Sequence, residues 1–118
     1  MLRFMQSAGA TVTFRCNDRP FTNAKVRLDE AEFFVDGWMG GPVKPDRFGV
    51  AKVHGSAAEI TQIDPYLRIT HWCNRSGMSP IQFCIDIPPQ FINYGREVKR
   101  YWHIRLELSK KHPKQRNC

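Results

Sequence analysis

The stretch at residues 63–73 constrains the fold more than any other part of the chain. Pro65 fixes its own φ and pushes the residue before it into an extended conformation, so no helix can run through this point. After Pro65 the side chains alternate with a period of two, which is typical of a β-strand in an antiparallel sheet. One face carries Leu67, Ile69, His71 and Cys73, and the other carries Tyr66, Arg68, Thr70 and Trp72.

His71 lies on the apolar face of this predicted strand. A single histidine there is more often a satisfied core residue than a metal ligand or a base, because buried polar atoms normally find partners. We therefore expect His71 to be a hydrogen-bonded part of the core.

Composition extends the β prediction to the whole chain. The 118 residues suggest one domain, and 42% hydrophobic residues are enough for a core. Eight Pro and eight Gly interrupt the sequence at short intervals, as in an all-β sandwich. We expect residues 1–9 to be frayed and residues 109–118 to form a basic tail that Cys118 ties down.

No apolar run approaches the ~20 residues of a membrane span, so we expect either a cytosolic protein or one whose leader has been removed.

Alternating patterns predict further strands at about 10–16, 24–28, 50–53, 81–87 and 98–108, with turns at 17–20 and 46–49, a loop at 74–80 and at most one helical turn within 90–95. The side chains expected to face the core are Val12, Phe14, Val26, Leu28, Ile81, Phe83, Ile85, Ile87, Val98, Trp102, Ile104, Leu106 and Leu108.

Residues 29–42 have two interpretations. An acidic patch at 29–32 precedes an apolar stretch at 33–42. The apolar stretch is either a core strand or an exposed loop that inserts into a bilayer interface. The acidic neighbours would be repelled by an anionic surface, so we favour the core strand.

The four cysteines are Cys16, Cys73, Cys84 and Cys118. An even number in a small domain suggests two disulfides and a secreted protein, and the alternative is four reduced, buried thiols. No pair has Cys-x-x-Cys spacing and no histidines cluster beside them, so we expect neither a metal site nor a cofactor. Asn74-Arg75-Ser76 is an acceptor sequence for N-glycosylation, which makes Asn74 a candidate modification site.

The net charge is +7, and most of it lies in residues 95–118, which hold eight Lys and Arg against two Glu. A one-sided basic region favours anionic partners such as lipid head groups, nucleic acid or sulfated glycans, and the alternative is a solvated face. The candidate lipid-binding residues are Lys99, Arg100, Arg105, Lys110, Lys111, Lys114 and Arg116.

Several motifs occur in order along the chain: Phe14-x-Cys16, Arg19-Pro20, Asp46-x-x-Gly49, Ile63-Asp64-Pro65-x-Leu67-x-Ile69-x-His71-x-Cys73, and a terminal Arg116-Asn117-Cys118. Together they resemble the nematode transthyretin-like family of small secreted proteins. The resemblance implies an all-β, transthyretin-like sandwich of two antiparallel sheets, with about seven or eight strands in a single domain over residues 1–118. It also implies that Cys73 pairs with Cys84, which leaves Cys16 for Cys118. Since Cys73 faces inward and Cys84 outward, that pairing would need a bulge or a strand end.

Most members of that family have no assigned activity. One is a bridging molecule that binds phosphatidylserine on dying cells and presents them to an engulfment receptor, and the basic, secreted character of this chain is similar. The expected function is therefore a secreted, extracellular adaptor between a phosphatidylserine-exposing membrane and a phagocyte receptor ectodomain. The alternative is a secreted protein- or small-molecule-binding module without lipid specificity. The sequence allows a homodimer, and nucleic acid is not an expected partner of a secreted protein.

Catalysis is not expected. The sequence offers no paired-carboxylate site, nucleophile elbow or metal motif. Related sandwiches that hydrolyse 5-hydroxyisourate end in Tyr-Arg-Gly-Ser, whereas this chain ends in Gln-Arg-Asn-Cys.

Overall fold

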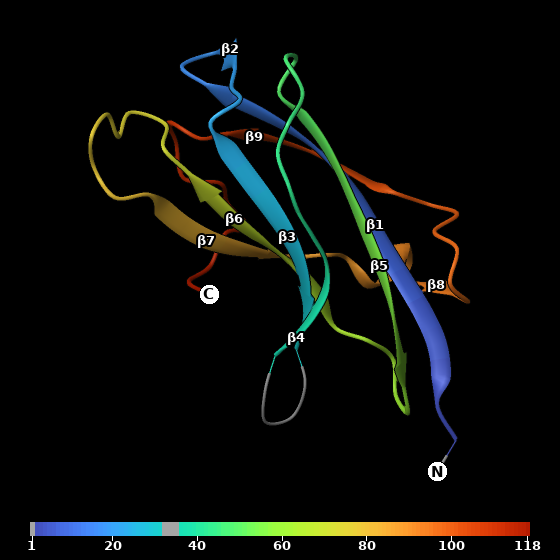
Figure 1. Ribbon diagram of the computed structural model, residues 1–118. Coiled ribbons are helices and arrows are strands. Elements are labelled where there is room, and N and C mark those ends of the chain that lie inside the picture. The colour runs from blue at the N-terminus through green and yellow to red at the C-terminus, as the bar shows by residue number, and fades with distance from the viewer. Residues whose placement is uncertain (1, 32–35) are drawn as a thin grey trace.

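The computed structural model describes residues 2–31 and 36–118 and consists of two β-sheets packed face to face (Figure 1). This confirms the predicted all-β sandwich, with nine strands in the described residues where seven or eight were expected. Within the described ranges the single helical segment is the three-residue 3₁₀ turn η1 (Pro89–Phe91), so no helix there could cross a bilayer.

The first sheet is built around β1 (Phe4–Cys16). β5 (Val50–Glu59) pairs with β1 in antiparallel fashion, and β9 (Trp102–Glu107) pairs with it in parallel fashion. Two short strands, β2 (Arg19–Pro20) and β8 (Asn93–Tyr94), complete this sheet. Because β1 has partners along its whole length, the residues at both of its ends are held in place.

The predicted frayed N-terminus is wrong for residues 4–9, which belong to β1. The buried amide of Gln6 explains the difference. Its oxygen accepts the backbone N–H of Ile63 at 2.9 Å, and its nitrogen donates to the carbonyl of Thr61 at 2.8 Å. These partners are more than fifty residues away in the sequence, so local patterning could not indicate them.

The second sheet has the strand order β4 (Gly37–Val43), β3 (Ala24–Glu30), β6 (Pro65–His71) and β7 (Ile81–Asp86), with every pair antiparallel. The alternation after Pro65 predicted β6 as a strand of an antiparallel sheet, and the structure places it at a central position in that sheet. The core lies between the two sheets, and its fully buried members include Val12, Phe14, Val26, Leu28, Leu67, Ile69, Ile85 and Leu106.

β4 and β5 come together at one edge of the sandwich. A Cβ atom on Gly40 would lie 2.0 Å from the carbonyl oxygen of His54, and one on Gly55 would lie 2.3 Å from that of Met39. Glycine is therefore required on both strands at this contact. The expected core strand at residues 33–42 is borne out for Met39, which is buried, but not for Trp38, which is 64% exposed. Residues 33–35 lie outside the described part of the chain.

Three smaller expectations are also corrected. Asp29 and Glu30 do not form a surface patch, because they end β3 and are buried. Ile81 is 38% exposed because β7 begins there, at the edge of the core. The last long strand begins at Trp102 rather than near residue 98, since the amide side chain of Asn93 accepts the backbone N–H groups of Lys99 and Arg100.

All four cysteines form disulfides, but the pairs are Cys16–Cys73 and Cys84–Cys118. The expected Cys73–Cys84 pair is wrong because β6 and β7 place Arg68 opposite Cys84, which leaves Cys73 beyond the end of the ladder. Cys118 does tie down the tail, and it does so against β7: Cys84 and Arg116 exchange backbone hydrogen bonds of 2.9 and 2.8 Å. The tail therefore covers the outer edge of the second sheet.

His71 is the satisfied core histidine that the sequence predicts. It is 2% exposed, and its Nδ1 accepts the backbone N–H of Cys73 at 3.1 Å. Burial lowers the pKa of its imidazole, and the nearby charge of Arg75 lowers it further.

Candidate anion-binding end of the sandwich

The turns at residues 17–18, 21–23, 44–49, 72–80 and 108–112 gather at one end of the sandwich (Figure 1). Strand register places them together. In the first sheet, Arg15 near the end of β1 lies beside both Pro20 and Glu107. In the second sheet, Ala24 at the start of β3 lies opposite His71 at the end of β6. The Cys16–Cys73 disulfide then joins the two sheets at this end.

Cations outnumber carboxylates at this end, which we call the basic end. Among the residues that the structure describes, none of its cations has an ion-pair partner. The cations are Arg19, Lys25, Lys44, Arg47, Arg75, Lys110 and Lys111, and the carboxylates are Asp18, Asp46 and Glu107. The unpaired charge makes this end attractive to anions.

Two of the three carboxylates are already occupied by backbone groups. Asp46 accepts the N–H groups of Phe48 and Val50 at 2.9 and 3.0 Å. Glu107 accepts those of Asn17 and Asp18 at 3.1 and 2.7 Å. Hydrogen bonds from Ser109, followed by those from Asp18 and Asn17, lower the pKa of Glu107 to about 2. These carboxylates hold the turns in shape and, within the described residues, do not form ion pairs with the neighbouring cations.

The turn at residues 46–49 projects an aromatic ring from the basic end. Gly49 has φ +82°, a conformation that favours glycine, and its N–H donates to the carbonyl of Asp46 at 2.9 Å. Phe48 is 61% exposed, and the guanidinium carbon of Arg47 lies 4.8 Å from its ring centroid. An exposed ring beside a cation on a rigid turn suits the interface of an anionic membrane.

The structure separates the seven predicted lipid-binding cations. Lys110 and Lys111 join the basic end, whereas Lys99 and Arg100 precede β9 and lie toward the opposite end. Arg105 projects from the outer face of the first sheet. The other two lie beside different groups: Lys114 has its Nζ 5.9 Å from the ring of Trp102, and Arg116 pairs with Asp86 at 2.9 Å.

Sequence analysis missed five cations of the basic end: Arg19, Lys25, Lys44, Arg47 and Arg75. The sequence did contain a signal for them, because each lies within two residues of a predicted turn, loop or strand end. Successive antiparallel strands reverse direction, so alternate turns return to the same end of a sheet.

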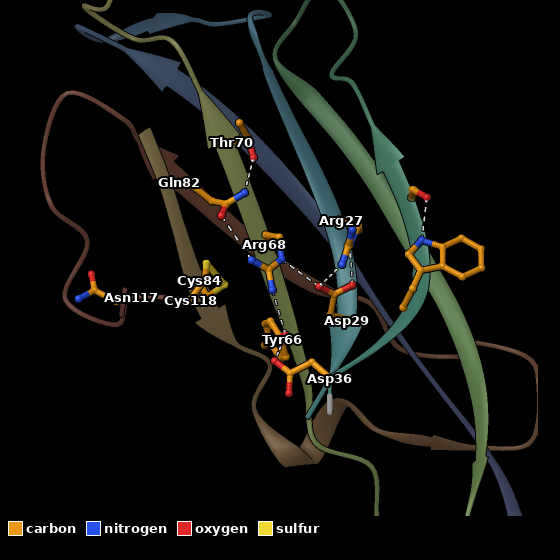
Figure 2. Close-up of polar contacts among 12 residues, drawn as sticks. Arg27, Asp29, Asp36, Tyr66, Arg68, Thr70, Gln82, Cys84, Asn117 and Cys118 are labelled. Atoms are coloured by element: carbon orange, nitrogen blue, oxygen red, sulfur yellow. Dashed lines mark hydrogen bonds and ion pairs between the residues drawn. A yellow bond between two sulfur atoms is a disulfide. The ribbon is translucent and has the colours of Figure 1, made fainter. Parts of the chain in front are cut away.

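The outer face of the second sheet carries a different charged cluster, which we call the Asp29 network (Figure 2). The fully buried carboxylate of Asp29 pairs with Arg27 at 2.7 Å and with Arg68 at 3.0 Å. Tyr66 donates to Asp36, and burial, reinforced by that hydrogen bond, raises the pKa of its hydroxyl. Both arginines are held in ion pairs with this carboxylate, so the cluster fits a structural role better than a binding role.

Asn74 is exposed in the loop at residues 72–80, where its Oδ1 accepts the side-chain N–H of Asn17 at 2.9 Å. Its glycosylation stays a prediction. In the described part of the chain, no three His, Cys, Asp or Glu side chains gather where they could hold a metal ion.

Comparisons with known proteins agree with this fold. The family model described as "TTR-52: Transthyretin-like family" matches residues 13–88. Among Caenorhabditis elegans proteins, transthyretin-like protein 2 is 32% identical over 96% of this chain and 82% of its own length. Transthyretin-like protein 5 is 36% identical over 82% of this chain and 71% of its own length. The chain therefore belongs to the transthyretin-like family.

Proposed function

We propose that this protein is a secreted adaptor that attaches through its basic end to membranes exposing phosphatidylserine and bridges dying cells to a receptor on the engulfing cell. The observation that carries the proposal is the group of unpaired cations around the rigid turn of Arg47 and Phe48. Each Lys or Arg near an anionic membrane contributes roughly 1 kcal/mol, so several together give usable affinity. Phe48 adds an apolar anchor that the charges alone lack.

An extracellular setting is supported by the two disulfides, since such bonds persist in oxidising compartments. Bridging requires two surfaces that can be occupied together. If the basic end lies on a membrane, the outer faces of both sheets stay accessible to a receptor (Figure 1).

The proposal is tested by sedimenting the protein with vesicles of phosphatidylcholine, with and without phosphatidylserine, at two salt concentrations. We expect binding only to the phosphatidylserine vesicles, and weaker binding at high salt. The triple variant Arg47→Gln, Lys110→Gln, Lys111→Gln should bind about a hundredfold more weakly at low salt, at about 1 kcal/mol for each charge.

The matched control is Lys99→Gln, Arg100→Gln, Arg105→Gln, which removes the same charge away from the basic end. It should bind almost as the parent protein does. Loss of binding in the control, with binding kept in the first variant, would move the membrane contact to the region around β9. Equal binding to both lipids would refute the phosphatidylserine proposal.

A protein-binding module without lipid specificity is the second candidate. It is favoured by Trp38, which is 64% exposed and whose indole N–H donates to the carbonyl of Gly41 at 3.0 Å. An exposed, fixed tryptophan is typical of the residues that dominate protein interfaces. This candidate predicts no sedimentation with either vesicle at either salt concentration.

A further inference from the structure

A pocket of about 210 Å³ opens at the basic end, on the outer side of the second sheet. It is smaller than the ~300–1,000 Å³ of pockets for drug-sized ligands, so it suits a molecule about the size of a head group. Its lining residues are Thr22, Asn23, Ala24, Lys25, Lys44 and Trp72.

Strand register explains why these side chains meet. Val26 of β3 lies opposite Val43 of β4 in an antiparallel pair. Lys25, which precedes Val26, and Lys44, which follows Val43, are therefore neighbours on the outer face. On the other side of β3, the backbone N–H of Trp72 donates to the carbonyl of Asn23 at 3.2 Å. The indole and the two lysines therefore extend from adjoining backbone segments that are fixed to one another.

The charge of the pocket is not balanced by the protein. No carboxylate lines it, and among the described residues neither Lys25 nor Lys44 has an ion-pair partner. Like charges at opposed positions of a sheet repel each other. An anion between the two ammonium groups would remove this repulsion and accept hydrogen bonds from both.

We propose that this pocket binds a phosphate group carried on a small polar molecule. The ammonium groups of Lys25 and Lys44 bind the phosphate oxygens. Thr22 and Asn23 supply a hydroxyl and an amide for the polar body, and the indole of Trp72 packs against its carbon atoms. The ligand is either a free phosphate ester or the head group of a lipid, and only the lipid source rests on the proposed membrane function.

O-phospho-L-serine serves as the probe, with L-serine and inorganic phosphate as matched partial ligands. Amide and indole resonances are followed by NMR during each titration. We expect O-phospho-L-serine to shift the resonances of Asn23, Lys25 and Trp72 saturably, with weaker binding of inorganic phosphate and none of L-serine. The double variant Lys25→Gln, Lys44→Gln should weaken binding of the probe by about tenfold or more, because hydrogen bonds to charged groups contribute strongly.

The matched control for this variant is Lys52→Gln, Lys99→Gln, which removes equal charge outside the pocket and should leave affinity for the probe unchanged. A probe that shifts no pocket resonance, or that binds the Lys25→Gln, Lys44→Gln variant as tightly as the parent protein, would overturn the proposal. Equal binding of L-serine would overturn it as well, because the phosphate would then not be recognised.

Phosphatidylserine vesicles distinguish the two sources. If soluble O-phospho-L-serine releases the protein from these vesicles, the pocket takes the lipid head group. If the probe fills the pocket while the vesicles stay bound, the ligand is a free ester. If the parent protein ignores the vesicles but binds the probe, the proposed membrane function fails and the pocket assignment stands.

Discussion

The basic end and the Asp29 network both contain basic residues close to carboxylates, but among the described residues the cations are ion-paired in the network and unpaired at the basic end. In the Asp29 network, Arg27 and Arg68 share one carboxylate that is fully buried. At the basic end, the carboxylates of Asp46 and Glu107 accept backbone N–H groups and leave the neighbouring cations unpaired. A positive side chain is therefore available to a ligand only where the carboxylates near it are engaged elsewhere.

Because of this difference, we expect mutations in the Asp29 network to affect the stability of the fold and mutations at the basic end to affect ligand binding. Breaking a buried ion pair is costly because the remaining charges lose their compensation. Neutralising an exposed, unpaired cation changes the free energy of unfolding by only about ±0.5 kcal/mol, since little is lost from the folded state. The two regions should therefore respond to mutation in opposite ways.

The largest effect is expected from Cys16→Ser, Cys73→Ser, which removes the covalent link beneath the basic end. This disulfide joins residues 57 positions apart. Its loss should lower the free energy of unfolding by about 3–4 kcal/mol, because the unfolded chain regains loop entropy. Urea denaturation monitored by circular dichroism measures the change. An unaltered midpoint would show that the core holds the two sheets together without this link.

Asp29→Asn should have the next largest effect, a loss of about 2–3 kcal/mol in the free energy of unfolding. This loss is smaller than the ~3–5 kcal/mol for breaking a fully buried pair, because the side chains of Arg27 and Arg68 are 42% and 23% exposed and can be partly hydrated. Asp86→Asn is the matched control: its side chain is 60% exposed and pairs with Arg116, so it should cost under about 1 kcal/mol.

Vesicle binding by Asp29→Asn should equal that of the parent protein. Weaker binding in this variant, with the fold intact, would contradict the separation between the two regions and would make the network part of the binding surface.

The smallest effect concerns pH and Glu107. Its pKa in the folded protein, about 2, is below the ordinary value of 4.5. Its contribution to stability is therefore fully present above about pH 4.5 and is lost as the pH falls toward 2. Urea denaturation at pH 5 and pH 2.5 should show a larger loss of stability for the parent protein than for Glu107→Gln. Equal losses would mean that the turn at residues 17–18 does not depend on this carboxylate.

Prediction from the sequence succeeded where the signal was local. Pro65 and the alternation after it predicted β6 and the buried position of His71, because side-chain direction along a strand follows from its period of two. Prediction failed where the partner was distant. The amide of Gln6 orders the N-terminal part of β1 through residues 61 and 63, and the ladder of β6 and β7 excludes a Cys73–Cys84 bond.

For the candidate site too, the local signal was read correctly and the contacts between distant residues were not. The excess of positive charge was evident in the sequence, yet it was assigned to the C-terminal segment because those cations are neighbours along the chain. In the folded protein β9 separates Lys99 from Lys110, and the register of β3 and β4 brings Lys25 beside Lys44.

Proline, glycine and the alternation of side chains specified the strands, the turns and the chemical character of this protein, because backbone conformation and side-chain direction depend on near neighbours. The choice of cysteine partners, the buried pairing of Asp29 and the gathering of cations at one end came from the pairing of the strands and the packing of the two sheets. Each of these depends on contacts between residues far apart in the chain, and a linear pattern carries no information on which distant segments will meet.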